Sequence, residues 1–194
     1  MSSSDDLTES QTSSRTVYQG SLLHVKEDQV QLPNGQSAKR EYILHPGAVV
    51  IIPLLANGHV VMERQFRYPL RRDVYELPAG KLDSGESALL CGQRELLEET
   101  GYCAAKWRYV ATIHPCIGYS NESMSLFLAQ ELTEGMHQRD GDEFLEVFTM
   151  PLNEAIEWVR VGRITDVKTV IGLFLAEKIL NGWLPPEFPD MAQA

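Results

Sequence analysis

Residues 80–102 of this 194-residue chain read GKLDSGESALLCGQRELLEETGY and carry its clearest structural signal. The first residues are typical of a loop, and residues 86–100 have helical periodicity. Ser84 is placed to cap the first helical turn, and Gly101 suits the left-handed turn that ends a helix. We therefore predict a loop followed by a helix that begins near Ser84–Glu86 and stops at Gly101.

The predicted helix has an apolar side and an acidic side. At about 100° per residue, its leucines share one stripe and its glutamates the opposite one. The leucines are Leu89, Leu90, Leu96 and Leu97, and the glutamates are Glu95, Glu98 and Glu99. Like charges at these spacings destabilise a helix by roughly a few tenths of a kcal/mol per pair. A bound cation would remove that repulsion, and hard divalent cations prefer carboxylate and carbonyl oxygens. A merely solvated acidic face is the alternative interpretation.

Three small residues, Ala88, Cys91 and Gly92, lie on the glutamate side one turn earlier. A glycine inside a helix costs about 1 kcal/mol relative to alanine. Gly92 therefore indicates a steric need, such as the close approach of a neighbouring loop or a ligand.

Composition and charge exclude several classes of protein. The formal net charge of −10 argues against a nucleic-acid partner, which usually requires a basic surface. No apolar run approaches the roughly 20 residues that span a bilayer, and residues 1–15 lack the features of a signal peptide. Cys91, Cys103 and Cys116 fit reduced structural thiols. We expect a cytoplasmic protein with no membrane segment.

The N-terminal quarter of the chain is expected to be separate from the rest. Residues 1–15 are polar and predict a disordered tail. Residues 16–45 predict a small antiparallel sheet, with strand-like stretches at Val17–Val25, Gln29–Leu32 and Ala38–Leu44 around a Pro-Asn-Gly turn. Residues 46–194 then form the main domain.

The main domain mixes strands and helices. Ala48–Leu55 is apolar enough for a strand buried on both faces, and Asn57-Gly58 predicts a hairpin into Val60–Tyr68. Further strands are expected at 106–114, 124–132 and 144–150, and helices at 151–161 and 166–181. The last helix should bury one apolar stripe, formed by Val167, Val170, Ile171, Phe174, Leu175 and Ile179. This pattern predicts an α+β fold with a mixed sheet covered on both faces.

The loop-helix also resembles the signature of a known family. Its spacing is similar to the Nudix box, G-x5-E-x7-R-E-U-x-E-E-x-G-U, with Tyr102 in place of the usual final aliphatic residue. The flanking segments look like the ADP-ribose pyrophosphatase subfamily, notably Arg40-Glu41, RQFRYP at 64–69 and YELPAG at 75–80. The resemblance implies the Nudix fold, a mixed β-sheet in an α/β/α sandwich.

The resemblance assigns metal and catalytic roles position by position. It implies that the Ala79 carbonyl, Glu95 and Glu99 bind metal, and that Glu98 holds a further metal ion or the attacking water. Two or three Mg²⁺ ions, or Mn²⁺ ions, are expected at each site. Arg94 would orient the carboxylates, although a plain surface ion pair is its alternative role. Glu143 matches a loop glutamate that positions or deprotonates the water, with Glu146 as the fallback.

The same resemblance implies a set of substrate-binding residues and a homodimer. Arg67 and Glu76 would face the substrate from the main domain. Arg40 and Glu41 would reach it from an N-terminal sheet that crosses to a partner subunit, and Glu122 would contact the terminal ribose.

The implied reaction is hydrolysis of the diphosphate bond of ADP-ribose, giving AMP and ribose 5-phosphate. Other nucleoside diphosphate sugars, such as GDP-mannose or ADP-glucose, are alternatives, because no aromatic residue for the base is evident at residues 21–23. A non-catalytic domain that senses a nucleotide sugar is a second alternative. An RNA-cap or RNA-end hydrolase is a third, but it would need a basic surface.

Overall fold

The computed structural model describes residues 7–135 and 144–183, which fall into two compact units. The first unit contains the chain up to Pro46 together with Cys116–Glu122. The second contains Gly47–Pro115 and the chain from Ser123 onward. No helix among the described residues has the length and apolar character needed to cross a membrane.

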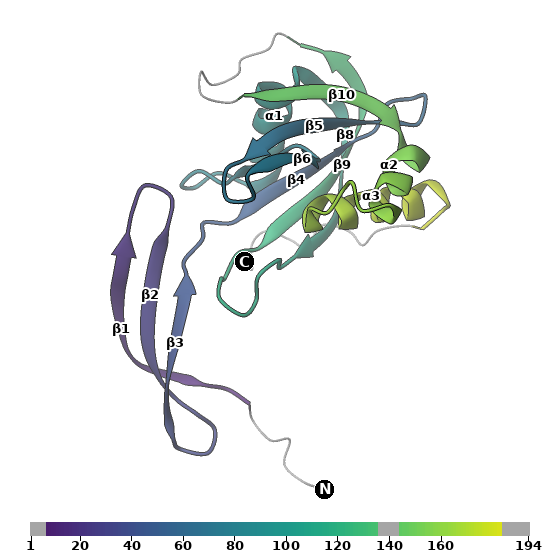
Figure 1. Cartoon of the computed structure of the whole chain (residues 1–194). Helices are drawn as coiled ribbons and strands as arrows, with labels where there is room; N and C mark the ends of the chain where they lie inside the picture. Colours follow the sequence, from purple (N-terminus) through teal and green to yellow (C-terminus); the bar gives the residue numbers. More distant parts are fainter. Residues whose placement is uncertain (1–6, 136–143, 184–194) are drawn as a thin grey trace, which may run out of the picture. The chain divides into compact units, whose positions relative to one another are not determined.

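The first unit is built on an antiparallel sheet of three strands in the order β1-β2-β3 (Figure 1). The strands are β1 (Ser10–Gln19), β2 (His24–Gln31) and β3 (Ser37–Ile43). Every residue of β1 is exposed, so backbone pairing and polar contacts order it rather than burial. One such contact joins the Gln11 amide to Asp28, with Nε2 2.8 Å from Oδ2. The sheet thus begins at Ser10, so the expected boundary between a disordered tail and the sheet, at residue 16, lies inside β1. No pattern in the sequence indicated this strand, because a fully exposed polar strand has no apolar alternation.

The second unit contains two sheets. A mixed sheet has the order β7-β4-β9-β8, in which β4 and β9 are parallel and the other pairs antiparallel. A second, antiparallel sheet has the order β10-β5-β6. The strands of the first sheet are β4 (Ala48–Pro53), β7 (Ala79–Lys81), β8 (Tyr102–Ile113) and β9 (Met124–Glu134). Those of the second are β5 (His59–Arg67), β6 (Arg72–Glu76) and β10 (Leu145–Pro151).

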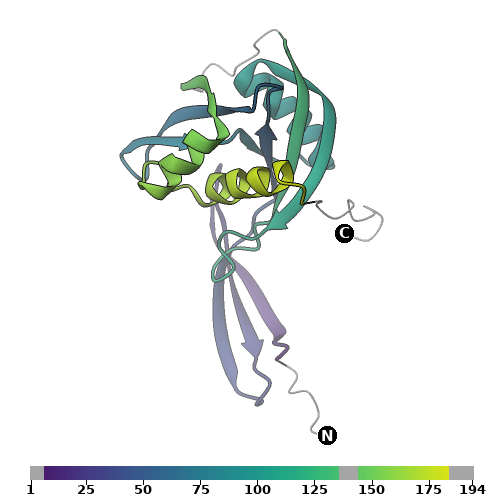
Figure 2. The ribbon, with the colours of Figure 1, turned by 90° about the vertical axis from the view of Figure 1, so that its right-hand side faces the viewer.

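The helices of this unit are α1 (Ala88–Glu95), which continues into a π-helical turn η1 (Leu96–Thr100), α2 (Leu152–Arg160) and α3 (Val167–Leu180). Figures 1 and 2 show α2 and α3 side by side.

Strand β4 separates the two halves of the core. Its six residues are all buried, and alternate side chains face opposite sides. Val49 and Ile51 join the cluster that includes Ala88, Cys91 and Leu96 under α1. Val50 and Ile52 join the larger cluster under α3 and the second sheet. A mixed sheet covered on both faces confirms the predicted α+β fold, with its α/β/α sandwich and small N-terminal sheet.

The buried face of α1 and η1 agrees with the expected one only in part, because Leu96 is fully buried but the two earlier leucines are not. Leu89 and Leu90 are 37% and 59% exposed, whereas Ala88, Cys91 and Gly92 are buried. A Cβ at Gly92 would lie 3.3 Å from Cγ2 of Val49 and 3.4 Å from Cζ3 of Trp107. The steric need at Gly92 is therefore close packing on the sheet, and the small face of the helix is the inner one.

The ends of this helix agree with the prediction only in part. Gly101 has a φ of 74°, which confirms the expected left-handed C-terminal turn. The N-cap is Ser87 instead of Ser84, and its side chain accepts a hydrogen bond from the Leu90 amide. The helix therefore begins later than expected, at Ala88.

Candidate active site

The acidic residues of the loop-helix gather around one arginine. Arg94 donates from Nε and Nη2 to both oxygens of Glu86, at 3.0 Å each. Its Nη1 lies 2.8 Å from Oε1 of Glu95 and 2.9 Å from Oε2 of Glu98. The guanidinium lowers the pKa of Glu86 to about 2, and its carboxylate partners raise the pKa of Arg94. The Arg94 guanidinium therefore connects three of the four glutamates of the loop-helix.

The fourth glutamate is held against the strand that precedes the loop. Glu99 is 8% exposed, and its Oε2 accepts a hydrogen bond of 3.0 Å from the Ala79 amide. The π-helical turn Leu96–Thr100 carries both Glu98 and Glu99, and such turns are frequent at functional sites. Glu99 thereby lies beside the backbone of β7.

Gly80 allows Glu95 to approach the same strand. A Cβ built at Gly80 would lie 1.8 Å from Oε1 of Glu95, a distance at which atoms clash. Only glycine therefore leaves room for the Glu95 carboxylate at this point. Two residues of β7 therefore meet two glutamates of the helix. Ala79 contacts Glu99, and Gly80 contacts Glu95.

The donor chemistry of this cluster fits a divalent cation. Glu86, Glu95, Glu98 and Glu99 carry four negative charges, against the one positive charge of Arg94. Hard oxygen donors with excess negative charge are the environment that Mg²⁺ and Mn²⁺ prefer. In the described side-chain positions, no three acidic, histidine or cysteine residues form a ready metal cluster. Glu95 and Glu98 are turned toward Arg94 instead.

A second charged group is centred on Glu76, three residues before Ala79 in the sequence. Arg67 donates to both oxygens of Glu76, with Nε–Oε1 at 2.6 Å and Nη2–Oε2 at 2.8 Å. Glu76 is only 4% exposed and also accepts a hydrogen bond from Lys168. Both Arg67 and Glu76 were expected to face the substrate. The Arg67 side chain is 45% exposed, whereas Glu76 is buried and holds Arg67 through both of its oxygens.

The remaining substrate-binding candidates belong to the first unit. Arg40 and Glu41 line a cavity of about 260 Å³ together with Tyr42 and residues 117–121. Arg40 also pairs with Glu9, with Nε 2.8 Å from Oε2. Glu122 lies 3.7 Å from the His45 ring, measured from Oε1 to Nε2.

Of the two candidates for the water-positioning glutamate, one can be placed. Glu143 lies outside the described residues. Glu146 lies on β10 and pairs with Arg64, with Nη2 2.7 Å from Oε2. Its side chain is therefore engaged across the β5–β10 pair.

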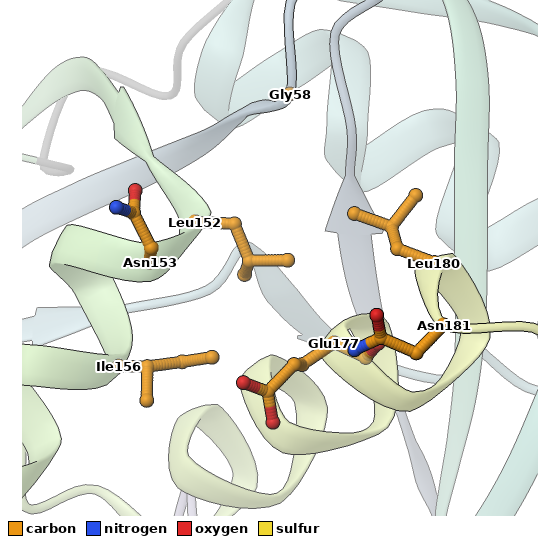
Figure 3. A pocket seen from close by; sticks show the side chains of 7 residues that line it. All are labelled: Gly58, Leu152, Asn153, Ile156, Glu177, Leu180 and Asn181. Atoms are coloured by element: carbon orange, nitrogen blue, oxygen red, sulfur yellow. The ribbon is translucent and has the colours of Figure 1, made fainter.

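Another cavity, of about 280 Å³, lies between α2, α3 and the turn at Gly58 (Figure 3). Leu152 and Ile156 line it from α2, and Leu180 lines it near the end of α3. None of its lining residues is a predicted site residue.

Comparison with known proteins places the loop-helix in its family. Residues 44–167 match the NUDIX domain. The chain belongs to the Nudix family of hydrolases. Residues 9–43 match a further domain, the nucleoside diphosphate sugar hydrolase N-terminal domain.

Relatives of this Nudix chain cover most of its length. It is 38% identical over 159 residues to an ADP-ribose pyrophosphatase of Bacillus subtilis, a match covering 81% of this chain and 86% of the relative. It is 30% identical over 175 residues to a GDP-mannose pyrophosphatase of Pectobacterium atrosepticum, covering 84% and 89%. A solved structure described as ADP compounds hydrolase has the same fold, with a TM-score of 0.81 and 24% identity. That match covers 90% of this chain and 95% of the other.

Sequence reasoning missed two residues of the second charged group, Lys168 and Thr169. They lie just beyond the end of the matched Nudix domain. Lys168 is 7% exposed, and the Thr169 hydroxyl accepts a hydrogen bond from the Leu77 amide at 2.9 Å. The only signal in the sequence was Asp166, which is placed to cap α3 and does so.

Proposed function

We propose that this chain hydrolyses the diphosphate bond of ADP-ribose to give AMP and ribose 5-phosphate, using Mg²⁺ or Mn²⁺. The observation that carries the proposal is the close approach of Glu95 and Glu99 to Ala79 and Gly80, beside an arginine-bound set of further glutamates. The B. subtilis relative, named an ADP-ribose pyrophosphatase, supports the choice of substrate.

The metal-binding residues of the proposal are the Ala79 carbonyl, Glu95 and Glu99, with Glu98 serving a further ion or the attacking water. Nudix hydrolases generally use divalent metals such as Mg²⁺, and two to three ions per site are proposed here. Divalent ions neutralise charge on a diphosphate and lower the pKa of a bound water. The four glutamates of the cluster exceed the single positive charge of Arg94 by three, and this excess supports such a site.

Arg94 has an orienting role in this proposal. Its guanidinium holds Glu86, Glu95 and Glu98 close to one another, so only their side chains have to turn when metal ions bind. Glu98 or Glu143 then accepts the proton of the attacking water. The position of Glu98 supports its role as the base, because its side chain is 35% exposed and can reach solvent.

Arg67 supplies the cationic contact to the diphosphate from the main domain. It projects from the buried Glu76 with its side chain 45% exposed. Arginine suits this task because its planar donors match phosphate oxygens in pairs.

The first unit contributes Arg40, Glu41 and Glu122 to substrate binding, and a cytoplasmic homodimer brings them to the site. The cavity that Arg40 and Glu41 share with residues 117–121 supports a binding role. The match of residues 9–43 to the N-terminal domain of nucleoside diphosphate sugar hydrolases supports it as well. Sedimentation velocity should show a dimer at assay concentration. A monomer that still turns over substrate would contradict the shared site.

GDP-mannose is the second candidate substrate, because a relative of similar coverage is named a GDP-mannose pyrophosphatase. ADP-glucose requires the same chemistry. A non-catalytic role in sensing a nucleotide sugar is less well supported, because every glutamate of the Nudix box is present.

A substrate panel tests these proposals directly. ADP-ribose, GDP-mannose, ADP-glucose and NADH would each be incubated with Mg²⁺ or Mn²⁺, and the products measured by phosphate release after phosphatase treatment. We expect the highest kcat/KM for ADP-ribose. Glu99→Gln should reduce kcat by about 100-fold or more, the scale of losing one electrostatic contact at a reacting centre.

Two outcomes of this panel would contradict the proposal. Failure of the wild-type protein to cleave any of the four compounds would reject the enzymatic function. Full activity of Glu99→Gln would reject the metal assignment. Glu154→Gln, an exposed glutamate on α2, is the control that removes the same charge elsewhere.

A further inference from the structure

Glu76 is a buried carboxylate shared by two cations from distant parts of the chain. Arg67 on β5 binds both of its oxygens, and Lys168 on α3 also binds Oε2. Arg67 is 9 residues away in sequence and Lys168 is 92 residues away. A buried charge is costly unless it is paired and hydrogen-bonded, and this one has both kinds of partner.

Lys168 is itself buried and fully engaged. Its ammonium donates to Oδ2 of Asp166 at 2.9 Å as well as to Glu76. Asp166 also caps α3, because its carboxylate accepts from the Thr169 amide and hydroxyl at 3.0 and 2.6 Å. The result is a line of alternating charge, Asp166–Lys168–Glu76–Arg67.

Only the last member of that line reaches solvent to a large extent. The Arg67 side chain is 45% exposed, compared with 5% for Glu76 and 9% for Lys168. The hydrogen bonds to Glu76 are the main cause that raises the pKa of Arg67. The exposed end of the line is therefore the part that a bound substrate can reach.

We propose that Lys168 is a positioning residue for substrate binding, acting through Glu76 on Arg67. This inference rests on the proposed function. By sharing Glu76, Lys168 fixes the carboxylate that orients the Arg67 guanidinium. It also offsets the charge of Glu76, which by itself would neutralise Arg67. The guanidinium is then held in one orientation, and Glu76 divides its charge between two cations instead of pairing with Arg67 alone.

Fixing α3 to the sheet does not require a buried lysine. Thr169 already ties the helix to the Leu77 amide, and Leu173 and Ala176 are fully buried in the apolar core. A methionine at position 168 would fill similar space without the cost of burying an ammonium group. The positive charge of Lys168 is therefore best explained by its effect on the orientation and charge of Glu76 and, through Glu76, of Arg67.

A double-mutant cycle separates this role from a purely structural one. Lys168→Met, Arg67→Gln and the double variant would be compared with wild type, measuring kcat and KM separately for the best substrate of the panel. We expect Lys168→Met to raise KM by about tenfold and to change kcat by less than about twofold. In the Arg67→Gln background, Lys168→Met should change KM by less than about twofold.

Three further variants complete the test. Lys168→Arg keeps the charge and should restore part of the affinity. Lys178→Met removes one positive charge from an exposed position of the same helix and should leave KM unchanged. If Lys168→Met fails to fold, as judged by circular dichroism, Lys168→Gln supplies the same comparison with a polar side chain.

The possible failures are distinguishable. A wild-type protein that cleaves no nucleoside diphosphate sugar rejects the proposed function and this inference together. An active wild type with an unchanged KM in folded Lys168→Met rejects the inference alone. A tenfold rise in KM that persists in the Arg67→Gln background also rejects it, because Lys168 would then act independently of Arg67.

Discussion

Gly80 and Glu95 are packed so closely that a single added methyl group at Gly80 would lie 1.8 Å from the Glu95 carboxylate oxygen. Gly80 lies on β7 and Glu95 on the last turn of α1, so the contact joins the strand to the helix. Gly80, a fixed position of the Nudix box, is therefore required for a steric reason, and this requirement can be tested.

Gly80→Ala should displace Glu95 and abolish most of the activity. A displacement of about 1 Å at a reacting centre can cost roughly 100-fold in rate, and we expect at least that loss in kcat. Metal affinity, measured by titration calorimetry with Mn²⁺, should fall as well. Gly85→Ala is the matched control, because a Cβ there meets no atom within 4 Å. Its φ of 79° predicts lower stability but retained metal binding. Normal Mn²⁺ affinity in Gly80→Ala would contradict the steric role.

Glu86 should make stability depend on pH in the acidic range. Arg94 lowers the folded-state pKa of Glu86 to about 2, below the ordinary value of 4.5. Its contribution to stability is therefore present above about pH 4.5 and is lost as the pH falls toward 2. Urea unfolding of wild type and Glu86→Gln should differ most near neutral pH and converge toward pH 2. Arg94→Gln should remove the same dependence, and a constant difference between wild type and Glu86→Gln would contradict it.

The inner face of α1 predicts an unusual pair of stability effects. Gly92→Leu places a large side chain against Val49 and Trp107, and overpacking should cost about 2 kcal/mol or more. Leu90→Ala removes a side chain that is 59% exposed, so it should cost less than about 0.5 kcal/mol. Urea denaturation of both variants measures the difference. The opposite order would show that the leucine face is the buried one.

Arg40 should affect substrate affinity more than other arginines of the first unit. Arg40→Gln should raise KM by about tenfold. Arg15→Gln is the control, because Arg15 is also an exposed arginine of this sheet paired with a glutamate, Glu27. Steady-state kinetics measure the KM of both variants, and only Arg40→Gln should differ from wild type. Equal KM values for Arg40→Gln and wild type would remove Arg40 from the proposed site.

Local sequence patterns correctly predicted the parts of the structure that are determined by residues close together in the sequence. The Ala48–Leu55 run is apolar throughout, and it forms a strand buried on both faces at Ala48–Pro53. Gly101 ends its helix because only a residue tolerant of positive φ suits that turn. The Nudix box glutamates were identifiable for the same reason, since their spacing lies within one short segment.

Side-chain size predicted the buried faces of the two helices only in part. Large apolar residues were expected to face the core in both α1 and α3. In α3, Val167 and Phe174 are 47% and 42% exposed, whereas Gly172 and Ala176 are buried. The other four residues of the expected stripe are partly buried against the core, namely Val170, Ile171, Leu175 and Ile179. Both helices pack closely on the buried strand β4, so the small residues have to face it. Hydrophobicity alone does not register how near a helix lies to a sheet.

Features held by long-range contacts were not predictable from local sequence. Strand β7 has only three residues and exists through pairing with β4. Lys168 is buried because it meets a carboxylate 92 residues away. A lysine in the first turn of a helix otherwise indicates an exposed position.

The shortness of β7 has a thermal consequence. It is an edge strand with three paired residues, Ala79, Gly80 and Lys81, and one of them is the proposed metal-binding Ala79. Edge segments with few backbone pairs open locally at a lower free energy than the domain as a whole. Heating should therefore detach β7 and inactivate the protein reversibly at temperatures where β4, buried in the centre of the same sheet, still protects its amides from exchange.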